Sequence, residues 1–162
     1  SLLKTMVRKI KNMIIVMCKN YDKGLIERYE DEIDRSKMLI DKAVIGALTY
    51  GKATKLKNIE LYYISLISKE LERMVDRLIR LSESDKKFLD EISEPIEILQ
   101  NILQDTLKLD QKYAMDFAKV ISSIKKPEVK DVKSNNMARI RHNLITISEV
   151  IMDWMVTLRL GD

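Results

Sequence analysis

The fold is decided by the stretch LERMVDRL, residues 71–78, and by its counterpart SEVIMDWM, residues 148–155. Aligned without gaps, the two stretches place Glu72 on Glu149 and Asp76 on Asp153. In both, the Glu and the Asp stand four residues apart inside an apolar stripe of helical spacing. A sequence period of about half the 162-residue chain predicts a duplicated structural unit.

Composition favours helix along the whole chain. Gly occurs four times and Pro twice, while 46% of the residues are hydrophobic and 33% are charged. With so few residues that interrupt a helix, most of the backbone can propagate one. We therefore predict an all-α fold.

Apolar stripes and turn residues predict six helices. Asp22 is a candidate N-cap and Gly51 a candidate C-terminal glycine of the second helix, and Asp110 is a candidate N-cap of the fifth. Pro95 predicts a kink in the fourth helix or its restart at Ser93. The expected stripes run to Lys19, from 26 to 44, 59 to 81, 88 to 107, 114 to 124 and 140 to 158, with a polar linker at 127–136.

Three predicted helices lie on either side of Ser84, so we expect one three-helix repeat at residues 1–83 and a second, degenerate one at 84–162. A three-helix unit cannot bury its apolar faces alone and would pack against its copy. The expected shape is an elongated, antiparallel six-helix bundle. Its buried residues should include Ile33, Leu71, Met74, Ile147 and Trp154.

Cysteine usage and charge restrict the class of protein. Cys18 is the only cysteine, which excludes a disulfide framework and fits a reducing compartment such as the cytoplasm. The apolar run at 13–17 is too short to span a bilayer. The net charge of +4 comes from interleaved charges rather than a basic block, which argues against direct nucleic-acid binding.

No catalytic constellation is present in the sequence. There is no glycine-rich phosphate loop and no nucleophile with a neighbouring histidine base, and the single histidine, His142, cannot build a conventional zinc enzyme site. We predict a protein that is not an enzyme. His142 stands beside Arg139 and Arg141 and is expected at the surface.

Two motifs, SKELERMVD at 68–76 and EDEIDR at 30–35, resemble those of the PhoU family of phosphate-uptake regulators. The stretch SKELERMVD at 68–76 is similar to the "arnLERigD" signature of the last helix in a PhoU repeat, and EDEIDR at 30–35 is similar to the middle-helix signature in its archaeal form. The chain departs from the family where His often follows the Asp, since Arg77 and Trp154 stand there. The middle-helix acidic pair is also absent from the second half, where Ala118 and Ser122 occupy the matching places.

The resemblance implies a function in phosphate homeostasis. It implies a regulatory adaptor, forming a homodimer, that docks on phosphate transporter components or a sensor kinase, free in the cytoplasm or peripheral at the inner face of the membrane. Family members also hold iron or zinc clusters through their acidic pairs. On this chain the corresponding metal ligands would be Glu30, Asp34, Glu72 and Asp76.

The residues themselves leave the role of these acidic pairs open. Carboxylates four apart on a helix repel one another by a few tenths of a kcal/mol. Either the nearby arginines Arg35, Arg73, Arg77 and Arg80 neutralise them, or a hard cation binds between them. In the second half, Glu149 and Asp153 could form at best a partial site.

Two further functions remain open at this stage. The first residue is Ser1 rather than Met, which indicates a processed start or a piece of a longer chain. The chain could then be the sensing or dimerisation half of a transcription regulator whose preceding domain binds DNA. Alternatively, it could be a helical bundle that stores or senses metal.

Overall fold

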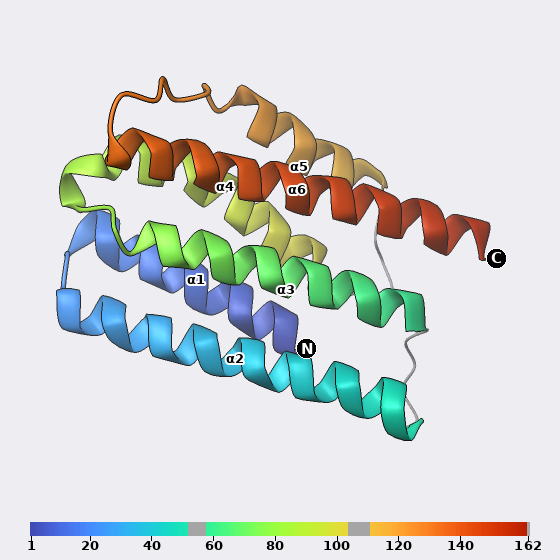
Figure 1. Ribbon diagram of the computed structural model, residues 1–162. Coiled ribbons are helices and arrows are strands. Elements are labelled where there is room, and N and C mark those ends of the chain that lie inside the picture. The colour runs from blue at the N-terminus through green and yellow to red at the C-terminus, as the bar shows by residue number, and fades with distance from the viewer. Residues whose placement is uncertain (52–57, 104–110, 162) are drawn as a thin grey trace.

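The all-α prediction is confirmed by the computed structural model, which describes residues 1–51, 58–103 and 111–161. Within these ranges the chain forms helices and no strand (Figure 1). The elements are α1 (Leu2–Lys19), α2 (Lys23–Tyr50), α3 (Asn58–Leu78), the 3-10 turn η1 (Glu83–Asp85), α4 (Lys86–Ile102), α5 (Gln111–Ser123) and α6 (Val132–Leu160).

Side chains and glycine fix the ends of α2 as the sequence predicted. The Asp22 carboxylate accepts a hydrogen bond from the Leu25 backbone N–H at 3.1 Å, which satisfies one of the free donors of the first turn. At the other end Gly51 adopts a φ of 58°, a left-handed conformation that an L side chain rarely adopts. The predicted cap Asp110 lies outside the described residues.

The predicted linker at 127–136 is too long, because α6 already begins at Val132. Asp131 accepts a hydrogen bond from the Ser134 backbone N–H at 2.8 Å, and the Ser134 hydroxyl accepts one from the Asp131 N–H at 3.0 Å. This reciprocal capping box starts the helix several residues before its apolar stripe. The sequence prediction followed the stripe and missed the cap.

The predicted restart at Ser93 is also wrong, since α4 runs without a break from Lys86 through Pro95 to Ile102. Pro95 removes one backbone donor from the helix interior, which costs about 3 kcal/mol in an isolated helix. Its ring is buried, as are Ile92 and Ile96 beside it. Burial of this apolar face therefore outweighs the local propensity of a single residue.

The six helices form a closed arrangement in which each helix has two main neighbours (Figure 1). α2 packs on α1 and α3, and α5 packs on α4 and α6, so these two helices form opposite edges. Between them, α1 packs on α4 and α3 packs on α6. The two halves of the sequence therefore meet along both of these pairs, and the predicted boundary at 83/84 falls in η1.

The core contains the side chains that the apolar stripes predicted. Ile33, Leu71, Met74, Ile147 and Trp154 are each 0% exposed, which confirms the prediction that they are buried. None of the described helices combines the length and the apolar content that are needed to cross a membrane.

Candidate functional site on two faces of helix α3

The acidic pairs of α2 and α3 lie close enough to influence one another. Burial raises the pKa of Glu30, and the charges of Asp34 and Asp76 raise it further. The pKa of Asp34 is raised by burial and then by Asp76 across the helix pair. The packing of α2 on α3 thus gathers carboxylates that are about forty residues apart in sequence.

A lysine of α2 acts on Glu72 in this acidic face. Burial raises the pKa of Glu72, and Lys37 is the neighbour that lowers it. The Lys37 ammonium also pairs with Asp41 one turn away on α2. The Lys37 charge therefore acts both on Glu72 of α3 and on Asp41 of its own helix, α2.

The arginines of α3 point elsewhere. Arg73 pairs with Glu70 at 3.2 Å, and Arg77 donates to the Asn143 side-chain oxygen of α6 at 3.3 Å. Within the described ranges, no ion pair joins an arginine to any of the four predicted metal ligands. The ion pair and hydrogen bond of Arg73 and Arg77 are thus made outside the acidic pairs, and of the four acidic residues only Asp76 acts on Arg77, through its charge.

The chemistry of the four carboxylates suits a hard cation, which prefers oxygen ligands. Among the described residues, however, no three His, Cys, Asp or Glu side chains lie close enough together to hold a metal ion. The arrangement as it stands is a cluster of repelling acids. Glu149 and Asp153, the counterparts in the second half, are exposed on α6.

We predict that Asp34→Asn raises the urea midpoint at pH 7. The folded-state pKa values of Glu30, Asp34 and Glu72 are raised, so folding binds protons. Their favourable contribution to the free energy of unfolding is fully present at a pH below the pKa values of the unfolded chain, which are about 4. It is lost as pH rises through the pKa values of the folded protein. The variant should therefore also lose less stability than wild type between about pH 4 and pH 7.

Circular dichroism during urea unfolding at several pH values would measure this difference. Asp153→Asn, on the exposed face of α6, is the matched control and should behave as wild type. If Asp34→Asn were less stable than wild type at pH 7, the carboxylate would have a stabilising partner and the repulsion described above would be absent.

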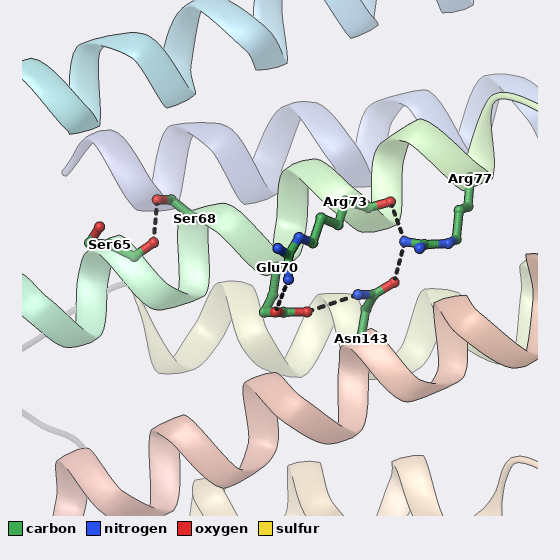
Figure 2. Close-up of polar contacts among 6 residues, drawn as sticks. All are labelled: Ser65, Ser68, Glu70, Arg73, Arg77 and Asn143. Atoms are coloured by element: carbon green, nitrogen blue, oxygen red, sulfur yellow. Dashed lines mark hydrogen bonds and ion pairs between the residues drawn. The ribbon is translucent and has the colours of Figure 1, made fainter.

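A second face of α3, about 100° around the helix from the acidic one, carries a polar network that reaches α6 (Figure 2). The Asn143 amide donates to Glu70 Oε2 at 2.8 Å, while its oxygen accepts from Arg77. The other oxygen of Glu70 binds Arg73, and Arg77 also donates to the Arg73 carbonyl at 3.1 Å. Asn143 is only 5% exposed, so this network fixes α3 against α6 in one register.

An open groove of about 620 Å³ lies beside this network, and we call it the arginine groove. The sequence analysis did not find it. The sequence does contain a sign of it, because residues three or four apart share one side of a helix. Arg73 and Arg77 stand four apart, and Arg139 and His142 stand three apart. The charged and amide side chains that line it are Glu70, Arg73, Arg77, Arg139, His142 and Asn143. His142 is exposed, as predicted.

Comparison of the chain with protein-family models, with curated proteins and with solved structures gave no match. The resemblance to the PhoU family therefore depends on the two quoted motifs alone.

Proposed function

We propose that the chain is a regulatory, non-catalytic adaptor that couples phosphate uptake or phosphate signalling to phosphate supply, docking on a transporter or a sensor kinase. The observation that carries this proposal is the placement of the two PhoU-like motifs. They lie on α2 and α3, which pack together and gather the acidic residues of both motifs. The family resemblance implies such packing, because the middle and last helices of a PhoU repeat are expected to lie side by side.

The packing pattern supports the idea of two equivalent three-helix repeats. Exchange of α1, α2 and α3 for α4, α5 and α6 maps the α1–α2 and α2–α3 neighbours onto α4–α5 and α5–α6. It also maps the contacting pairs α1–α4 and α3–α6 onto themselves. Such a pattern is expected when a duplicated unit packs against its own copy.

The adaptor proposal is tested in the native host. If the gene is deleted, phosphate uptake should stop responding to the phosphate content of the medium, and the wild-type gene should restore the response. Uptake of labelled phosphate in cells grown with high and with low phosphate measures the effect. A deletion strain whose uptake still responds normally would contradict the proposal.

An exposed apolar strip on α2 supports a docking function and a homodimer. Met38, Ile45 and Leu48 are 51%, 60% and 52% exposed, and their spacing places them on one side of the helix. Large apolar side chains that share one side of a surface helix are typical of contact surfaces. We propose that this strip is part of the contact in a homodimer.

We predict that wild-type protein sediments as a dimer at tens of micromolar, an order of magnitude set by ordinary dimer affinities, and that Ile45→Glu sediments as a monomer. A carboxylate in the centre of the strip would have to be desolvated on association. Val132→Glu, at a residue that is 74% exposed on α6, is the matched control and should stay dimeric. Monomeric wild type, or dimeric Ile45→Glu, would exclude this contact.

A metal-binding bundle is the second candidate, supported by the raised pKa values of Glu30, Asp34 and Glu72. Burial raises these pKa values most and repulsion raises them further, and a cation bound after modest rotation of the side chains would offset both effects. We propose iron or zinc, with Glu30, Asp34, Glu72 and Asp76 as ligands.

Calorimetric titration with iron, zinc or manganese tests the metal proposal. The double variant Glu72→Gln, Asp76→Asn should abolish binding, because it removes the oxygen ligands that α3 contributes while nearly preserving side-chain volume. The matched control Glu149→Gln, Asp153→Asn on α6 should retain it. Wild-type protein that binds none of these metals would show that the acidic face is only a solvated surface.

A further inference from the structure

We propose that the arginine groove between α3 and α6 binds a small phosphate dianion, either inorganic phosphate or the phosphate group of a small hydrophilic ester. This inference does not depend on the adaptor function proposed above. It follows from the charge, the fixed geometry and the lining of the groove.

The groove has a clear excess of positive charge. Three guanidinium groups, those of Arg73, Arg77 and Arg139, line it against the single carboxylate of Glu70. An arginine remains charged at any physiological pH and presents several donors in a planar fork that matches phosphate oxygens. A group with two negative charges balances such a set better than a single carboxylate does.

Part of the groove is already held in position. The Arg77 guanidinium is fixed by two acceptors, the Arg73 carbonyl at 3.1 Å and the side-chain oxygen of the buried Asn143 at 3.3 Å. Asn143 is in turn held by Glu70 at 2.8 Å (Figure 2). Both contacts of Arg77 use one nitrogen, so its remaining N–H donors can serve a ligand with little loss of conformational entropy.

The protein balances the positive charges in the groove only in part. Burial lowers the pKa of Arg77, the nearby charges of Arg139, Arg80 and Arg73 lower it further, and the charge of Asp76 opposes them. Among the described residues, the side chains of Arg139 and His142 form no hydrogen bond or ion pair. A bound anion would supply the missing counter-charge.

The lining also restricts the kind of ligand. The volume of about 620 Å³ lies in the range of small-molecule sites. Among the described residues that line the groove, His142 carries the single aromatic ring, so the groove lacks the pair of large aromatic side chains that would enclose a nucleotide base. Thr146 and Asn143 offer hydrogen bonds instead, which favours inorganic phosphate or a sugar phosphate.

Titration calorimetry of the full chain in low-salt chloride buffer tests the proposal, with inorganic phosphate and glucose 6-phosphate as separate probes. Binding of at least one probe is expected, and the tighter probe identifies the source of the phosphate group. Arg139→Gln should weaken binding about tenfold or more, the loss expected for one charge-assisted hydrogen bond. Arg8→Gln removes an exposed arginine of α1 and is the matched control.

Because Arg139 is exposed, both variants should fold, and thermal unfolding curves would verify this. Three results would overturn the proposal. The first is no binding of either probe up to about 10 mM, a concentration that saturates even a millimolar site. The second is equal weakening by Arg8→Gln, which would indicate diffuse charge. The third is tighter binding of a poly-glutamate peptide that Arg139→Gln abolishes, which would indicate an acidic protein partner.

Discussion

Replacement of Trp154 with Ala is expected to lower the free energy of unfolding by about 3–5 kcal/mol, because it removes a large side chain from a close-packed core. Trp154 is 0% exposed and stacks on Tyr63 of α3, with ring centroids 6.0 Å apart and an interplanar angle of 20°. The Tyr63 hydroxyl also hydrogen-bonds to the Thr157 hydroxyl of α6 at 2.8 Å. These contacts join the C-terminal half of α6 to α3.

Trp154→Phe is the matched control, and its loss should be clearly smaller. The indole Nε1 is buried and has no hydrogen-bond partner among the described residues. A buried donor without a partner costs about 1–3 kcal/mol, and phenylalanine removes that donor while keeping an aromatic ring. Urea unfolding should be followed by circular dichroism, since the variants lack the only tryptophan. Equal losses in both variants would show that ring packing is not the source of the effect.

Ile147→Asp is expected to prevent cooperative folding at neutral pH. Ile147 is 0% exposed on α6, the helix that packs on α3. A carboxylate at this position would be buried without a partner, which costs several kcal/mol in addition to the lost apolar contacts. The total stability of a domain of this size is about 5–15 kcal/mol, so a single such change can consume most of it.

Two variants separate burial from helix propensity at this position. Val156→Asp introduces the same residue on the same helix at a position that is 47% exposed, and it should change stability by about 0.5 kcal/mol or less. Ile147→Val should cost about 0.5–1.5 kcal/mol. Far-ultraviolet circular dichroism and urea unfolding measure all three. A cooperatively folded Ile147→Asp protein would mean that the α3–α6 core admits water or a counter-charge.

Local sequence patterns were enough to predict most of the helices and the side of each that is buried. Apolar residues at helical spacing predicted Ile33 and Trp154 as core residues, and Asp22 and Gly51 predicted the ends of α2. These predictions succeed because helix periodicity and capping are local and involve residues three or four apart. The start of α6 was missed, because the cap at Asp131 precedes the apolar stripe, and of the two alternatives predicted for Pro95 the restart at Ser93 does not occur, because α4 continues through it.

The sequence could not predict which neighbouring helix each polar side of α3 meets, because that depends on the tertiary packing. Glu72 and Arg73 are neighbours in sequence, but they meet different helices. Charged side chains of α2 shift the pKa of Glu72, while Arg73 lines the arginine groove between α3 and α6. Helical spacing fixes the angle between two side chains and carries no information about which helix lies on either side. Asn143, which holds both Glu70 and Arg77, is 66 or more residues away from them in sequence. The arginine groove therefore exists only because the core packs α3 against α6, which brings arginines from both helices to one surface.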